Sequence, residues 1–125
     1  MINTNYNQDE DIVYVERFDE IDLQELLTYI ISLDQEYKDL GSLYILDDIR
    51  DSTSKYEAKD YPVIIGEIQK RIKKYNEVRC ALVVDTPFET VLSILYEDIS
   101  KSVDNYNYKT FSTIEAAKSW LKRRI

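Results

Sequence analysis

The chain has 125 residues, the usual size of one domain, with 44% hydrophobic residues and a single cysteine. Its formal net charge of −8 argues against nucleic acid as a partner, because neutralising phosphates requires a basic surface. One cysteine excludes a disulfide framework, and the chain has no run of about 18 apolar residues for a membrane span and no signal-peptide pattern at its N-terminus. We therefore expect a single domain in the cytoplasm.

The first half of the chain contains two strand patterns and one helix pattern. Residues 1–10 are polar and rich in asparagine, which favours a polar arm or a short edge strand. Residues 12–15 and 43–46 are apolar runs typical of buried strands. Between them, Asp22 stands three residues before a glutamate, the spacing of a capping box, and the helix should stop before Gly41. The apolar stripe of this helix consists of Leu23, Leu26, Leu27, Ile30 and Ile31.

The second helix has two competing start signals. Residues 54–57 have the spacing of a capping box, which favours a start at Ser54, whereas Pro62 is most compatible with a first helical turn. Both starts remain open at this point. The buried face of this helix is expected to consist of Ile64, Ile65, Ile68, Ile72 and Tyr75.

Residues 79–99 combine a buried strand, a tight turn and an amphipathic helix, and the other segments look like repeats of this unit. Residues 80–84 are apolar without alternation, as expected of a strand covered on both faces. Thr86, Pro87 and Glu89 occupy the N-cap, first and third helical positions of a strong helix start. The stripe expected to lie against the sheet consists of Phe88, Val91, Leu92, Leu95 and Ile99.

The last pair of elements completes a repeating pattern. Residues 106–111 alternate polar and aromatic side chains, which suits an edge strand, and Ser112 is expected to cap a final helix. Strand and helix thus alternate four times, which is typical of parallel strands joined by right-handed crossovers. We predict an α/β fold in βαβαβαβα order, with a mainly parallel sheet of four or five strands, helices on its faces, and a single domain over residues 11–125.

Three features resemble the STAS-like proteins, and the resemblance covers about residues 11–124. A strand leads into aspartates at residues 43–48, a strand of the Ala-Leu-Val-Val type occupies residues 81–84, and the chain closes with the pattern Phe111-x-Thr113-x-Glu115-Ala116-Ala117-x-x-Trp120-Leu121. These small bacterial domains are grouped with the anti-sigma-factor antagonists and, more loosely, with the CRAL-TRIO lipid carriers. The resemblance implies a STAS-like fold, but the proteins this chain looks most like have no assigned activity, so it implies no functional residue.

The resemblance also draws attention to the segment after residues 43–48. In the antagonists, an Asp-Ser-Ser-Gly-type turn carries a serine whose phosphorylation switches partner binding, whereas the corresponding segment here begins at Asp51 and has no glycine. Ser52, Thr53 and Ser54 are nevertheless candidates for phosphorylation, at a helix N-terminus where added negative charge is favourable. Capping by Ser54 is the simpler alternative.

Carboxylates follow two of the predicted strands. Asp47, Asp48 and Asp51 follow residues 43–46, and Asp85 follows residues 80–84. Ligands usually bind at the C-terminal ends of such strands, so these carboxylates are candidates to hold Mg²⁺ or to accept a phosphoryl group. If the strand order is 2-1-3-4, however, the two ends lie roughly 9 to 10 Å apart, too far for one ion. The alternative is that Asp47 and Asp48 pair with Arg50 or cap a turn.

The residues needed for most enzymatic chemistry are missing. The sequence has no histidine, no glycine-rich phosphate loop, no Gly-x-Ser-x-Gly elbow and no cysteine pair. We therefore expect no catalytic residue, cofactor or metal site, and a non-enzymatic regulatory or protein-interaction module whose partner is a protein.

The 11 tyrosines suggest an alternative function. Several lie on or beside predicted helices and could line an apolar cavity between helix and sheet, or could simply pack over the core with their hydroxyls in water. These tyrosines are Tyr29, Tyr56, Tyr61, Tyr75 and Tyr96. The alternative to the interaction module is thus a carrier or binder of a small apolar or lipid-like ligand, and a weaker alternative is an Mg²⁺-dependent phosphoacceptor domain.

Overall fold

In the computed structural model, the chain folds into a five-stranded sheet with four α-helices. The structure describes residues 1–123, apart from the side chains of Phe88, Leu92 and Ser93. The strands are β1 (Ile2–Asn7), β2 (Ile12–Ile21), β3 (Leu43–Ser54), β4 (Val78–Val83) and β5 (Tyr106–Phe111). The helices are α1 (Leu23–Tyr37), α2 (Tyr61–Ile72), α3 (Pro87–Ser100) and α4 (Ile114–Lys122), with a short 3₁₀ turn, η1 (Ala58–Asp60), before α2. The last two residues of the predicted domain, 124 and 125, lie outside the described residues.

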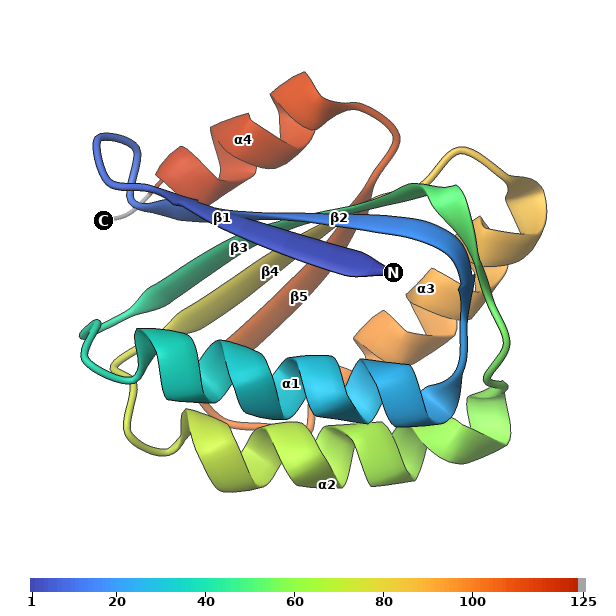
Figure 1. Ribbon diagram of the computed structural model, residues 1–125, viewed down its shortest axis with the longest axis horizontal. Coiled ribbons are helices and arrows are strands. Elements are labelled where there is room, and N and C mark those ends of the chain that lie inside the picture. Colours follow the sequence, from blue (N-terminus) through green and yellow to red (C-terminus); the bar gives the residue numbers. More distant parts are fainter. Residues whose placement is uncertain (124–125) are drawn as a thin grey trace.

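The sheet is mixed, with the order β1-β2-β3-β4-β5. The polar N-terminal segment forms an edge strand, β1, which pairs antiparallel with β2, whereas β2 to β5 are parallel to one another. The predicted parallel strands and the edge position of β5 are confirmed, but the assumed order 2-1-3-4 is wrong. Each crossover moves the chain one strand further in the same direction, so α1, α2 and α3 cover one face of the sheet and α4 covers the other (Figure 1).

The two faces of the sheet have separate apolar layers. Along β3, Leu43 and Ile45 belong to the layer under α1, α2 and α3, whereas Tyr44 and Leu46 belong to the layer under α4. This alternation follows from the two-residue period of a strand. The larger layer, on the side of the three helices, contains the site described below.

The N-cap residues agree with the predicted capping patterns in two of the four helices. The N-cap side chains of Asp22 and Thr86 accept hydrogen bonds from the backbone three residues ahead, at 2.7 and 3.2 Å. The second helix begins at Tyr61 with Pro62 in its first turn, and the predicted start at Ser54 is wrong. Ser54 instead ends β3, because β3 continues to pair with β2 as far as the partners Ile21 and Ser54. Thr113, rather than Ser112, caps α4.

The buried face of α2 agrees with the predicted stripe, that of α1 agrees only in part because Leu33 and Tyr37 are buried as well, and that of α3 does not agree. Val91 and Leu95, predicted to face the sheet, are 58% and 45% exposed. The helix instead turns Glu89, Tyr96 and Ser100 toward the protein, where the Tyr96 ring packs against the rings of other core tyrosines. The other predicted stripe members include Phe88 and Leu92, whose side chains lie outside what the structure describes.

Within residues 1–123, the helices are too short and too polar for any of them to cross a membrane.

Candidate functional site

A buried ion pair lies between β2 and β3, on the face covered by α1, α2 and α3. Val13 and Val15 face this side of β2, and Arg17 continues the same alternating row into the interior, next to a register irregularity in the pairing with β3 between Glu16 and Phe18. On β3, Asp47 continues the inward row of Leu43 and Ile45. Arg17 and Asp47 are 7% and 1% exposed, so both charges are removed from water.

The geometry of this pair is bidentate. Nε of Arg17 donates to Oδ1 of Asp47 at 3.0 Å, and Nη2 donates to Oδ2 at 2.5 Å. Nη1 of Arg17 donates to the hydroxyl of Tyr56 at 3.0 Å, and the guanidinium carbon lies 5.7 Å from the centre of the Tyr29 ring. Two tyrosines thus contact the buried cation in addition to Asp47.

Burial and charge act in opposite directions on this pair. Burial by itself would lower the pKa of Arg17, but the Asp47 carboxylate holds that pKa well above its ordinary value, so the guanidinium stays charged. Burial raises the pKa of Asp47 from its ordinary value of 3.8, and the attraction of Arg17 opposes this rise. The carboxyl therefore depends on Arg17 to remain ionised inside the protein.

The ion pair borders a cavity of about 100 Å³ between the sheet and the three helices. We call it the tyrosine-lined cavity, because seven tyrosines line it together with aliphatic side chains of the sheet, of α1 and of α2. They are Tyr29, Tyr56, Tyr61, Tyr75, Tyr96, Tyr106 and Tyr108. The first five are the tyrosines that the sequence pointed to, and of the two alternatives left open for them, lining of a helix-to-sheet cavity is the one observed.

The tyrosine rings form a connected series across the cavity. The ring centres of Tyr56 and Tyr61 lie 6.4 Å apart, those of Tyr61 and Tyr96 lie 5.3 Å apart, and those of Tyr96 and Tyr108 lie 4.5 Å apart. Burial raises the pKa of the Tyr75 hydroxyl to about 12 and raises the pKa values of Tyr61 and Tyr96 as well. These phenols are therefore neutral at physiological pH and present rings and hydroxyls rather than charges to the cavity.

One end of the cavity contains Glu89, which is only 7% exposed. Its carboxylate accepts hydrogen bonds from the backbone N–H and the hydroxyl of Ser54, at 3.1 and 3.3 Å. These bonds tie the end of β3 to the first turn of α3. Glu89 thus closes this end with a second buried carboxylate.

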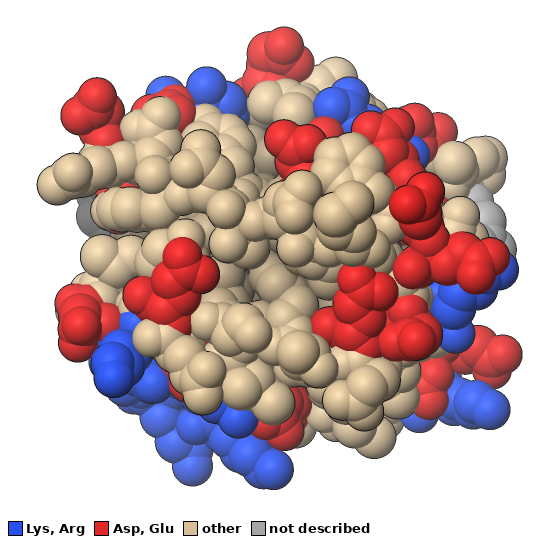
Figure 2. Space-filling model, in the orientation of Figure 1, with Lys and Arg blue, Asp and Glu red and all other residues tan. Residues whose placement is uncertain are grey.

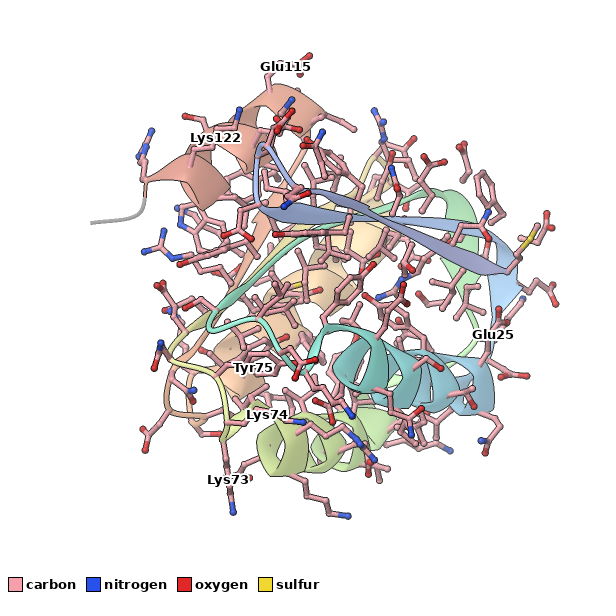
Figure 3. The ribbon with its side chains drawn as sticks, turned by 60° about the vertical axis from the view of Figure 1, so that its left-hand side comes forward. Glu25, Lys73, Lys74, Tyr75, Glu115 and Lys122 are labelled. Carbon is pink, nitrogen blue, oxygen red and sulfur yellow. The ribbon has the colours of Figure 1, made fainter. Side chains whose placement is uncertain are left out.

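Charged side chains surround the other end, at the C-terminal ends of α1 and α2. The Asp34 carboxylate accepts from Arg71 at 3.2 Å and from the Tyr75 hydroxyl at 3.4 Å, and Lys74 lies 2.5 Å from it. Figure 2 shows basic side chains gathered at the lower left, over this part of α2. Figure 3 shows Lys73, Lys74 and Tyr75 just after α2, with Lys73 pointing into solvent. Asp34 therefore connects the cavity to the basic end of α2.

A search of solved structures finds an uncharacterized protein of the DUF3478 family with a SpoIIAA-like fold, from Shewanella loihica PV-4. The match has a TM-score of 0.63 and covers 97% of this chain and 92% of that one. This chain has a SpoIIAA-like fold. The predicted STAS-like fold is thereby confirmed, and at 13% sequence identity the likeness shows the fold alone. Searches against protein-family models and curated proteins find no match.

The carboxylates predicted as a site are separated by this SpoIIAA-like sheet. Asp48 and Arg50 form the predicted pair, with two hydrogen bonds of 2.9 Å. The pairing of Asp47 with Arg50 is wrong, because Asp47 points to the opposite face, toward Arg17. Asp51 and Asp85 are exposed.

The ends of β3 and β4 also lie closer together than the assumed strand order implied. The two strands are direct neighbours, with Asp48 opposite Val83, so their ends lie one strand spacing apart rather than two. Even so, no three acidic or cysteine side chains in residues 1–123 are grouped closely enough to hold a metal ion. The neighbouring ends therefore do not assemble the proposed Mg²⁺ site in the described part of the chain.

The three phosphorylation candidates lie in β3. The prediction that they stand at a helix N-terminus, where added negative charge is favourable, is therefore wrong. The Ser52 hydroxyl donates to the carbonyl of Ile49 at 2.9 Å, Thr53 is exposed, and Ser54 contacts Glu89. The end of β3 pairs with β2, which keeps this segment extended.

Arg17 and Glu89 are among the site residues that the sequence reasoning did not identify. For Arg17 a signal exists: it continues the two-residue row of Val13 and Val15, so it falls on the buried face and requires a partner. Glu89 was assigned only a capping role. The contact of its side chain with Ser54, 35 residues away, is not encoded in any local pattern.

Proposed function

We propose that this protein is a non-enzymatic regulatory module that binds a small, largely apolar ligand in the tyrosine-lined cavity. The observation that carries the proposal is the combination of an apolar cavity with a few converging polar groups, centred on the buried pair of Arg17 and Asp47. Such a combination is the usual form of a small-molecule site. A cytoplasmic location remains part of the proposal.

The size of the cavity favours a compact ligand. A dry cavity of about 150 Å³ accommodates benzene, and typical ligand pockets have about 300 to 1,000 Å³. The tyrosine-lined cavity, with about 100 Å³, therefore suits a molecule of a few heavy atoms. A lipid-like ligand would require the helices to move away from the sheet.

A ligand screen by NMR tests this proposal. Compounds of up to about six heavy atoms are added to the ¹⁵N-labelled protein, and binding should shift amide signals around Cys80 on β4, which lines the cavity. Cys80→Leu should abolish these shifts by filling the space, while Val63→Leu, on the exposed side of α2, should leave them unchanged. The proposal fails if no compound shifts the cavity signals, or if Cys80→Leu binds as the wild type does.

A second candidate function, protein interaction, has support from α3. Val91, Ile94 and Leu95 form its outer face and are each at least 45% exposed, although large apolar side chains on one helix are normally buried. Ile94→Asp should abolish binding of a genuine partner in affinity capture, whereas Val63→Asp, at a similarly exposed position on α2, should retain it. Equal capture by both variants would contradict a role for this face.

The third hypothesis, an Mg²⁺-dependent phosphoacceptor, has the weakest support. Asp47 and Asp48 are both engaged by arginines, on opposite faces of β3. Stabilisation by Mg²⁺ that is lost in Asp48→Asn would favour it.

A further inference from the structure

The guanidinium of Arg17 has more donors than the acceptors that the described residues offer it. A guanidinium carries five N–H groups. Two of them donate to Asp47 and one donates to Tyr56. Each guanidinium nitrogen thus has one acceptor, and the described residues make no hydrogen bond with the remaining two N–H groups, although Arg17 is only 7% exposed and lines the tyrosine-lined cavity. Buried donors without acceptors are unfavourable, so an acceptor placed in the cavity would be bound preferentially.

The charge of the cavity decides which kind of acceptor fits. Arg17 is already neutralised by Asp47, and Glu89 adds a further buried carboxylate nearby. The lining as a whole contains two basic and three acidic side chains, of which Arg71 and Asp34 pair with each other at the far end of the cavity. An anionic ligand would therefore bring a fourth negative group into a site that has no surplus positive charge. A neutral acceptor avoids this repulsion.

We infer that the ligand is a small neutral carbonyl compound, such as a ketone, amide or ester, whose oxygen accepts hydrogen bonds from Arg17 while its apolar part lies among the tyrosine rings. This inference deepens the proposed function and rests on it. A carbonyl oxygen has two lone pairs, and an apolar ring or chain of a few carbons matches the rest of the lining.

Three matched probes test the inference on the full-length protein: cyclopentanone, methylenecyclopentane and cyclobutanecarboxylate. Cyclopentanone and methylenecyclopentane have nearly the same shape but differ in the acceptor oxygen, and cyclobutanecarboxylate carries a charge. NMR titrations followed at cavity signals should give a dissociation constant for cyclopentanone about tenfold lower than for methylenecyclopentane. Cyclobutanecarboxylate should bind most weakly.

A double variant controls for the role of the guanidinium. Arg17→Met together with Asp47→Leu replaces the ion pair with apolar side chains of similar size, a change that buried pairs often tolerate. In this variant the preference for cyclopentanone should disappear, while methylenecyclopentane should still bind.

The outcomes separate the inference from the proposed function. If cyclopentanone and methylenecyclopentane bind equally well, or if cyclobutanecarboxylate binds best, the carbonyl inference is overturned while ligand binding in the cavity stands. A preference for cyclopentanone that survives in the double variant also overturns the role of Arg17. If none of the probes binds the wild type, the inference falls together with the proposed function.

Discussion

Replacing Arg17 with methionine would leave the carboxylate of Asp47 buried without its partner. Asp47 is 1% exposed and receives two hydrogen bonds from Arg17, so nothing else in the described residues compensates its charge. Removing one member of a buried pair typically costs about 3 to 5 kcal/mol, out of a total stability of roughly 5 to 15 kcal/mol. We expect the unfolding constant to rise by roughly two to four powers of ten, measured by urea denaturation with the fluorescence of Trp120.

The loss in Arg17→Met should depend on pH. Burial raises the pKa of Asp47 above 3.8, and without the opposing charge of Arg17 this rise should be larger. A carboxyl whose pKa is higher in the folded state binds more protons when folded, so stability falls as pH rises from the ordinary pKa to the folded-state pKa. The deficit relative to wild type should therefore be greatest at neutral pH and should shrink as the pH approaches 4.

Two further variants test whether the stability loss in Arg17→Met comes from the burial of the charge or simply from the loss of an ion pair. Arg17→Met with Asp47→Leu should recover most of the lost stability, since apolar replacement of a buried pair is often neutral or favourable by about 1 to 4 kcal/mol. Arg50→Met breaks the pair with Asp48, in which Arg50 is 37% exposed, and should cost less than about 1 kcal/mol. If Arg17→Met costs no more than Arg50→Met, the reasoning from burial is refuted.

Two other regions give independent predictions. Ser54→Asp places a second carboxylate beside buried Glu89 and should lower the unfolding free energy by about 1 to 3 kcal/mol. As a control, Thr53→Asp at an exposed position should change the unfolding free energy by less than about 0.5 kcal/mol. Similar urea denaturation curves for the two variants would contradict this prediction. Hydrogen bonds from Tyr14 and two lysines lower the pKa of Glu10 from 4.5 to about 2, so the stability that they provide is complete above pH 4.5 and is lost as the pH falls through 2. A carboxyl NMR titration should show this midpoint, and Tyr14→Phe should raise it; a wild-type midpoint near 4.5 would contradict the assignment.

The local elements were predictable because their signals lie within a few residues. The edge strand at residues 106–111 and the first-turn position of Pro62 follow from alternation and from backbone chemistry. The capping role of Thr86 is equally local, because an N-cap side chain bonds a backbone group three residues ahead. The helix start that was predicted at Ser54 also rested on a local capping pattern. It is wrong because the pairing of β3 with β2 extends to Ser54 and keeps this residue in a strand.

The part of the candidate site that the sequence indicated is its aromatic lining. Several tyrosines lie on or beside the predicted helices, and neighbouring elements bring them together around one cavity. The rotation of α3 was not predictable in the same way. Apolar side chains occur on more than one side of this helix, so periodicity alone did not decide whether Leu95 or Tyr96 would face inward.

The sequence by itself determined the number, type and order of the repeated strands and helices, because hydrophobic period and capping chemistry act over a few residues. Only the tertiary structure decided which strands are neighbours and which side chains meet across them. Arg17 and Asp47 are 30 residues apart and form an ion pair only because β2 lies directly beside β3 and both side chains point to the same face of the sheet. Burial makes that contact energetically important, and burial belongs to the assembled sheet and helices rather than to any one segment.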